Sequence, residues 1–168
     1  MKLLASRTAQ YPLVAQLIGN FNNWVVDALT GSKVTLGSTV AAATDPNEPG
    51  LLGAVANTAI SFDAIPLPVG AIVTGGELIV DTAYAGCTAA TISLGIVGAL
   101  TDLLSTVNLM ATGRTAFALT GLITEDSLAG GANLRMTIAY TVANATAGKF
   151  RLRVMYTIDG RAHEVQIT

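Results

Sequence analysis

The chain has 168 residues, enough for one domain with a buried core and short for two. Charged residues make up only 12% of it, against roughly 25% in an ordinary soluble domain, while 51% is apolar and the mean hydropathy is +0.56. This composition excludes a disordered chain. Because so few charges cover a surface thinly, we expect much of the surface to contact other protein.

The charges also limit the partners and the chemistry. Nine basic and eleven acidic residues give a net charge of −2, so no excess of cations is present to hold nucleic acid. Cys87 and His163 are single residues of their types, which excludes an internal disulfide and a Cys/His metal cluster. The apolar run between Lys2 and Arg7 is too short for a secretion signal. We therefore expect no cofactor, no metal and no nucleic-acid partner.

The first 50 residues have two interpretations. Apolar residues from Leu13 to Leu29 could line one face of a helix, but turn-forming Gly and Asn residues interrupt that face. We favour short strands at Val14–Phe21, Trp24–Ala28 and Lys33–Leu36.

The stretch Ala41–Gly50 carries two prolines and is the best candidate for a boundary or an exposed loop. On this basis residues 1–50 are expected to form an N-terminal arm with short strands that contacts neighbouring subunits. Residues 51–168 are expected to form the main β domain.

The middle of the chain consists of short apolar segments separated by turn signals. Ala56–Ile65 is a predicted strand, and the segment 66–70 (PLPVG) turns the chain into a second strand, Ala71–Val80. Gly75 and Gly76 inside that second strand suggest a bulge or a bend. Further strands are predicted at Ala90–Ile96, Leu103–Met110 and Ala116–Ile123.

The segment from Thr82 to Thr101 has no charge and is about as long as a membrane span. Glycines and threonines break it, and its most apolar part (TISLGIVGAL) is shorter than a bilayer. It therefore predicts a buried strand with its loops and no membrane partner.

The second half alternates strictly between apolar and polar residues. Residues 133–142 and 149–158 each place one apolar set on one face, which is the period of a half-buried strand. Asp159-Gly160 is a favoured pair for a tight hairpin, so Arg161–Thr168 is expected to return beside the preceding strand. Turn signals at this spacing predict an all-β antiparallel sandwich or barrel.

Catalytic groups are scarce. His163 beside Glu164 could act as a base, but the same residues suit a solvated strand; Cys87 has no basic neighbour to stabilise a thiolate and is expected to be inert. Two acidic pairs, Glu77/Asp81 and Glu125-Asp126, come without the exposed aromatics of a sugar cleft, so ion pairing or solvation is favoured. We expect no enzyme.

One charge pattern is worth testing. Lys149, Arg151 and Arg153 lie on one face of the last long strand, and Arg135 is expected to join them from the neighbouring strand. This stripe could dock on an acidic partner or be the wetted face of a sheet. Together with Trp24, these four cations are the candidate partner contacts.

Several segments resemble a known group of proteins. They are 65–80 (IPLPVGAIVTGGELIV), 81–84 (DTAY), 91–95 (TISLG), 112–116 (TGRTA) and 156–161 (YTIDGR). They look like segments of virion structural proteins of tailed bacteriophages, and specifically of jelly-roll head decoration, or cement, proteins. The similarity covers roughly residues 51–168, with a weaker likeness in Tyr11–Val40, and it rests on turns and strands rather than on catalytic residues.

The resemblance implies a jelly-roll sandwich with an N-terminal arm, located on the capsid surface of the virion. It also implies binding to the major capsid protein and to further copies of itself, often as a trimer. The alternative is a glycan- or cell-surface-binding module of a head or tail fibre or collar, for which Trp24 or Tyr84 would have to be exposed.

Overall fold

The computed structural model describes residues 12–29, 31, 33–37, 59–119, 132–141 and 145–158. These residues form ten strands and no helix. The strands are β1 (Leu13–Asn20), β2 (Trp24–Val26), β3 (Lys33–Thr35), β4 (Ile60–Leu67), β5 (Ala71–Ala85), β6 (Ala89–Ile96), β7 (Ala99–Asn108), β8 (Gly113–Ala116), β9 (Ala132–Thr141) and β10 (Ala147–Ile158).

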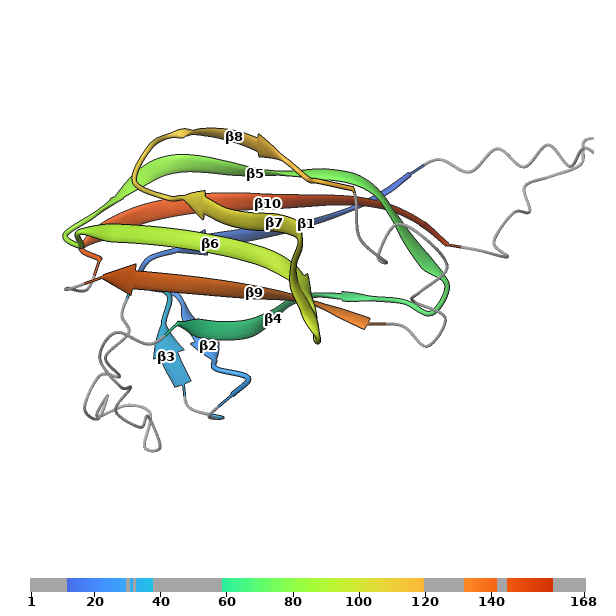
Figure 1. Cartoon of the computed structure of the whole chain (residues 1–168), viewed down its shortest axis with the longest axis horizontal. Helices are drawn as coiled ribbons and strands as arrows, with labels where there is room; N and C mark the ends of the chain where they lie inside the picture. Colours follow the sequence, from blue (N-terminus) through green and yellow to red (C-terminus); the bar gives the residue numbers. More distant parts are fainter. Residues whose placement is uncertain are drawn as a thin grey trace, which may run out of the picture.

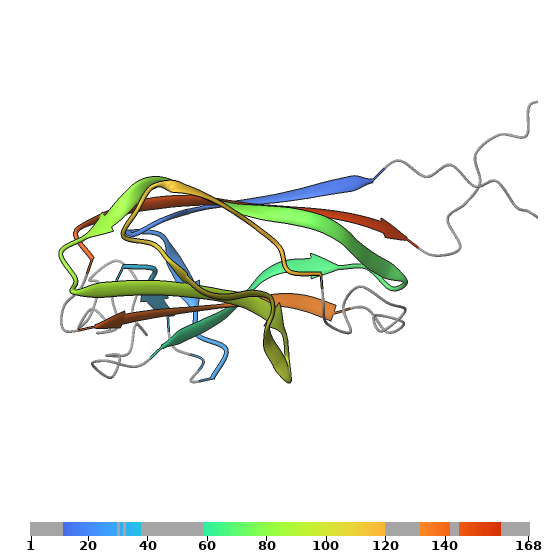
Figure 2. The same cartoon turned by 45° about the horizontal axis from the view of Figure 1, so that its top comes forward.

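Eight of the strands form two antiparallel sheets that pack face to face (Figures 1 and 2). The first sheet has the order β1-β10-β5-β8, and the second has the order β4-β9-β6-β7. The expected all-β antiparallel sandwich is therefore confirmed, and a closed barrel is excluded because each sheet has two edge strands.

The strand pairing is that of a jelly roll. The first four strands of the sandwich, β1, β4, β5 and β6, pair with the last four in reverse order, giving β1·β10, β4·β9, β5·β8 and β6·β7. Two further pairings, β10·β5 and β6·β9, join these nested hairpins side by side. A long hairpin rolled up in this way is the arrangement of jelly-roll folds.

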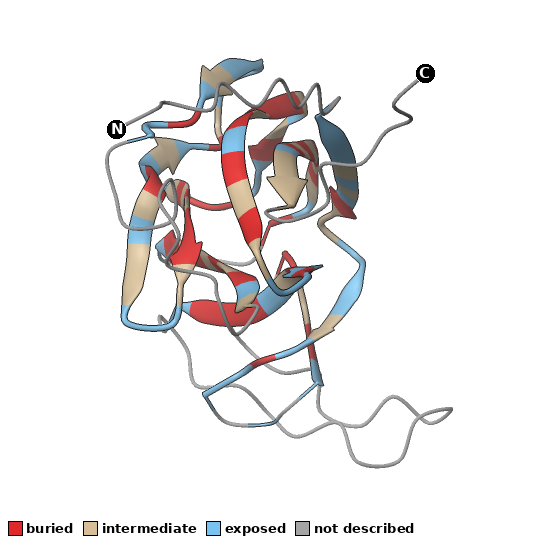
Figure 3. Cartoon of the chain, turned by 90° about the vertical axis from the view of Figure 1, so that its right-hand side faces the viewer, coloured by how far each residue is buried: buried red, intermediate tan, exposed pale blue. Residues whose placement is uncertain are grey.

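The core lies between the two sheets and follows from the alternation in the sequence. Phe150, Leu152 and Val154 of β10 are fully buried, as are Met136 and Ile138 of β9. The intervening residues of both strands are mostly of intermediate exposure. Figure 3 shows buried residues alternating with less buried ones along strands of the sandwich. Each strand thus presents one apolar face to the opposite sheet.

The hairpin of β2 and β3 lies beside β4 and β9, below the sandwich in Figure 1. Val34 and Leu36 enter the core, and the Tyr140 hydroxyl donates a hydrogen bond to the Leu36 carbonyl oxygen. The Ala28 N–H donates to the Ser61 carbonyl oxygen of β4 at 2.5 Å, and the Ser61 N–H donates to the Asp27 carboxylate at 3.0 Å. The end of β2 therefore covers part of the β4 edge.

The expected irregularity at Gly75 and Gly76 is present. The pairing of β5 with β10 shifts next to Gly75, where Thr74 is the extra residue of a bulge. A Cβ atom at Gly76 would meet the Phe117 ring and would lie 2.5 Å from the Arg153 carbonyl oxygen. Glycine is required at this position because the backbone of β10 and an aromatic ring approach it closely.

Several predicted strand boundaries were wrong. β4 continues through Pro66 to Leu67, which an edge strand permits because the missing N–H can face away from the sheet. β5 extends to Ala85 instead of ending at Val80. The predicted strand Ala116–Ile123 is also misplaced. β8 covers Gly113–Ala116, the four residues that pair with β5, and therefore ends where the predicted strand began. The uncharged segment 82–101 forms parts of three strands with turns between them, as predicted.

Other predictions concern residues outside the described ranges. The boundary at 41–50 and the return strand Arg161–Thr168 both lie there, so the division of the chain at residue 50 stays a prediction. In the described part, β1 belongs to a sheet of the sandwich, and β10 has β1 on one side and β5 on the other.

Candidate interaction surface

The outer face of the β1-β10-β5-β8 sheet carries most of the predicted cations. Lys149, Arg151 and Arg153 alternate with the buried residues of β10 and are partly exposed, so their predicted common face is confirmed. The same face carries Glu77 and Asp81 of β5.

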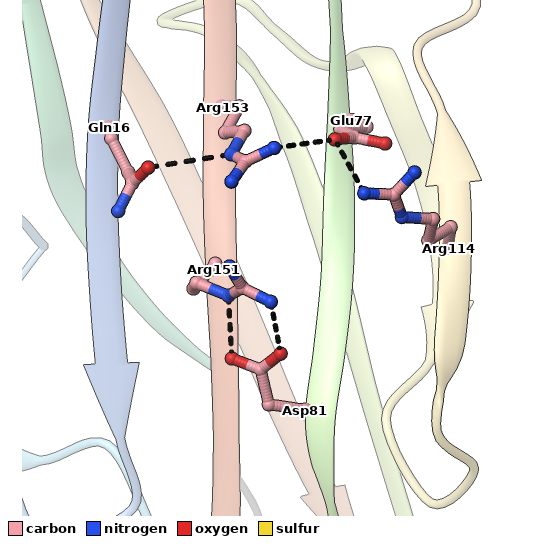
Figure 4. A network of polar contacts seen from close by, with 6 residues as sticks. All are labelled: Gln16, Glu77, Asp81, Arg114, Arg151 and Arg153. Atoms are coloured by element: carbon pink, nitrogen blue, oxygen red, sulfur yellow. Dashed lines mark hydrogen bonds and ion pairs between the residues drawn. The ribbon is translucent and has the colours of Figure 1, made fainter.

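Arg151 forms the tightest ion pair of this face. Its Nε and Nη2 atoms donate to the two carboxylate oxygens of Asp81 at 2.7 and 2.6 Å (Figure 4). This two-point geometry holds the pKa of the Asp81 carboxyl below its ordinary value. Arg151 is therefore fixed on the sheet by its own chain.

A row of polar side chains crosses all four strands beside this pair. The Nε atom of Arg153 donates to the Gln16 amide oxygen at 3.4 Å, and its Nη1 atom lies 3.4 Å from Oε1 of Glu77. Arg114 of β8 approaches the same Glu77 oxygen at 3.5 Å (Figure 4). We call Gln16, Arg153, Glu77, Arg114, Arg151 and Asp81 the charge ladder.

The charge ladder lies over apolar side chains. Ile79 is only 6% exposed, and its register places it between Arg151 of β10 and Arg114 of β8. A shallow hollow next to the ladder is lined by Val14, Gln16, Gly76, Glu77, Ala116, Arg153 and Met155. An apolar floor with fixed charges around it suits contact with another protein.

Arg135 does not join this face, so that prediction was wrong. It lies on β9, which belongs to the other sheet, whereas β1 and β5 are the neighbours of β10. Its Nε atom donates to Asp63 at 2.9 Å, and the Asn133 amide donates to the same carboxylate at 3.0 Å. The Arg135 guanidinium holds the pKa of the Asp63 carboxyl below its ordinary value.

Trp24 lies near this second pair. Its side chain is 44% exposed, and it lines a hollow together with Val25, Val26, Ala28, Phe62 and Asp63. Trp24 and the Arg135–Asp63 pair thus form a second candidate surface, where β2 meets the edge of β4.

Burial shifts the pKa of three groups in the described core. Cys87 is buried, and burial raises the pKa of its thiol, which agrees with the inert cysteine that the sequence predicts. Burial also raises the pKa of Tyr84 and Tyr140, so both stay protonated. Tyr84 is only 1% exposed and therefore cannot serve as a surface aromatic.

Other chemical candidates lie outside the described ranges, namely His163 and the Glu125-Asp126 pair. Within the ranges that the structure describes, no three His, Cys, Asp or Glu residues gather in a way that could hold a metal ion. The same residues contain no helix with the length and apolar content needed to cross a membrane.

Sequence reasoning missed some members of these surfaces. Arg114 and Gln16 come from strands far apart in the sequence, so only the order of the sheet brings them to Arg153 and Glu77. Val14 and Ile18 of β1 were also missed as surface residues, because apolar alternation in a strand normally indicates burial.

The strand order and pairing define the fold of the chain as a jelly-roll sandwich. No family model and no curated protein matches the chain. A chain of the solved "Cyanophage Pam1 capsid asymmetric unit" is similar to it with a TM-score of 0.56 and 20% sequence identity, over 94% of each chain. The likeness shows that the two chains share a fold along almost their whole length.

Proposed function

We propose that the protein is a structural component of a bacteriophage capsid, which decorates the head by binding the major capsid protein and further copies of itself. The observation that carries this proposal is the jelly roll shared with a cyanophage capsid chain over 94% of both chains. The segments that resemble cement proteins of tailed phages support the same function, and a non-enzymatic role follows from it.

The charge ladder supports the outer face of the β1-β10-β5-β8 sheet as the surface that meets the capsid. This face carries four cations, Arg114, Lys149, Arg151 and Arg153, but only two carboxylates, those of Glu77 and Asp81. The face is therefore positive although the whole chain is slightly negative. An acidic patch on the major capsid protein is the matching partner surface.

Binding to capsids tests the proposal. Purified protein is mixed with capsids from a phage that lacks this chain, and the bound copies are counted after sedimentation. We expect saturable binding, weakened at least about tenfold by Lys149→Glu with Arg114→Glu, since each reversal places a charge of the wrong sign on the face. Lys33→Glu, a matched reversal on β3, should bind like the wild type.

Two results would argue against the proposal at different levels. Wild-type protein that does not bind these capsids contradicts the decoration function. Full binding by the Lys149/Arg114 variant contradicts only the assignment of the surface.

The trimer that the resemblance implies stays a prediction for the oligomeric state of the bound protein.

A second candidate function is favoured by the exposed Trp24. An indole beside a hollow and a fixed carboxylate is a platform on which a sugar ring can stack. A glycan array would show binding that Trp24→Ala abolishes if the protein is a receptor-binding module of a fibre or collar. No binding on the array removes this candidate.

A further inference from the structure

The sandwich has four edge strands, and three of them are protected against pairing with another chain. β8 has only four residues. β4 carries Pro66 and a register shift between Asp63 and Ile65, and Asp27 and Ala28 bind its edge. β7 is broken by two register shifts. Short strands, prolines, bulges and covering segments are the features by which proteins avoid edge-to-edge association.

Among the residues that the structure describes, the fourth edge, β1, has none of these features. It pairs with β10 over eight residues without a register shift, and its sequence (LVAQLIGN) contains no proline and no charged residue. In the described part of the chain, β10 is its single neighbour within the sheet. Val14 and Ile18 are 62% and 47% exposed on its outer side. A regular, neutral strand of this kind is a template for a further strand.

The side chains of β1 are complementary to a second β1. Val14, Gln16 and Ile18 point outward, whereas Ala15 and Leu17 pack against the core. In an antiparallel pair centred on Gln16, Val14 lies opposite Ile18 of the second copy, and the two Gln16 amides face each other. On the inner side Ala15 lies opposite Leu17. Each apolar side chain of one copy then lies opposite an apolar side chain of the other copy and covers it. No side chains of like charge face each other.

We propose that β1 is the edge on which a second copy of this chain docks, with the two β1 strands antiparallel about a two-fold axis at Gln16. The two four-stranded sheets then form one continuous eight-stranded sheet, which is an isologous contact. The inference rests on the self-association included in the proposed function and names its surface. If a trimer also forms, this contact joins two trimers.

A charge swap across β1 tests the two-fold contact and its register. Light scattering during size-exclusion chromatography should give wild-type protein a mass that is an even multiple of 17.2 kDa. Val14→Lys alone and Ile18→Glu alone should each halve that mass, because each buries two unpaired charges in the contact. The double variant should restore it, because Lys at 14 lies opposite Glu at 18 only in the antiparallel register centred on Gln16.

The control is Val97→Glu, which changes an equally exposed apolar residue in the turn after β6 and should leave the mass unchanged. A monomeric or strictly trimeric wild type overturns the inference, as do single variants that keep the wild-type mass or a double variant that does not regain it. Capsid binding is measured on separate samples. A wild type that binds capsids but has an odd-numbered mass overturns this inference and leaves the proposed function standing.

Discussion

Tyr84 and Tyr140 have neighbouring rings in the core but different hydroxyl environments. Their ring centroids are 6.0 Å apart. The Tyr140 hydroxyl donates to the Leu36 carbonyl oxygen and so ties the β2-β3 hairpin to the second sheet. The Tyr84 hydroxyl is buried and interacts with Tyr140, but it makes no hydrogen bond of ordinary length to the described residues. The Tyr140 hydroxyl therefore stabilises the fold, whereas the buried Tyr84 hydroxyl lowers the free energy of unfolding.

Removing each hydroxyl should have opposite effects on stability. We expect Tyr84→Phe to raise the free energy of unfolding by about 1 kcal/mol, because a buried polar group without an ordinary hydrogen bond is removed. Tyr140→Phe should lower it by about 1–3 kcal/mol, because the Leu36 carbonyl oxygen loses its donor. Urea denaturation of the two variants measures both values. Equal destabilisation by the two substitutions would show that the Tyr84 hydroxyl also makes a stabilising hydrogen bond.

The ion pairs of Asp63 and Asp81 make stability depend on acid. Arg135 and Arg151 hold the pKa of these carboxyl groups below their ordinary value of 3.8. A carboxyl whose pKa is lower in the folded state stabilises the fold above the pKa of the unfolded chain, and this stability is lost as the pH falls through the folded pKa. The loss is therefore expected below about pH 4.

Thermal unfolding followed between about pH 7 and pH 3 tests this dependence. Asp81→Asn should be less stable than the wild type at neutral pH and should lose less stability in acid, since its side chain no longer takes up a proton. Asp102→Asn, at a carboxylate without an ion pair among the described residues, should keep the acid loss of the wild type. An unchanged acid loss in Asp81→Asn would contradict the role of the Arg151 pair.

At the scale of the strands, Gly76 and Gly113 are a matched pair of glycines in adjacent strands of the same sheet. A Cβ atom at Gly76 would meet Phe117 and the Arg153 carbonyl oxygen, whereas one at Gly113 would have no heavy atom within 4 Å. Gly76 also has a φ of +158°, which L residues rarely adopt, whereas Gly113 has no positive φ, so the two glycines differ both in packing and in backbone conformation.

Alanine should be tolerated at one of these positions and not at the other. Gly76→Ala should lower the free energy of unfolding by about 1–3 kcal/mol, because its Cβ atom overpacks the site and its backbone φ is unfavourable for alanine. Gly113→Ala should leave it unchanged or raise it slightly, since alanine restricts the unfolded chain. Chemical denaturation measures both variants. A Gly76→Ala protein as stable as Gly113→Ala would contradict the close contact of β5, β10 and Phe117.

Local pattern predicted the strands better than their partners. The alternation in β9 and β10 gave the buried faces, because each residue's burial there follows a period of two. Pairing depends on contacts far apart in the sequence, so the sequence pattern put Arg135 beside β10 and began the eighth strand at Ala116, where β8 ends. Lys149, Arg151 and Arg153 were placed correctly because they share one strand, whereas Arg114 and Gln16 reach them only through the sheet order.

For the whole molecule, the low charge content has a structural counterpart. The few charges of the described surface are largely paired within the chain, as in the charge ladder and the Arg135–Asp63 pair. Apolar side chains such as Val14, Ile18 and Trp24 stay exposed. A surface of this kind gains stability when it is covered by other protein, at about 25 cal/mol per Å² of apolar area. This is the expected property of a chain that works within an assembly.

The most direct measurement is the temperature at which DNA escapes from phage heads with and without this protein, followed by the fluorescence of a DNA-binding dye. The proposed decoration function predicts that heads lacking the chain release DNA at a lower temperature, and that added purified protein restores the wild-type value. An equal release temperature for heads with and without the protein would contradict its role in stabilising the capsid.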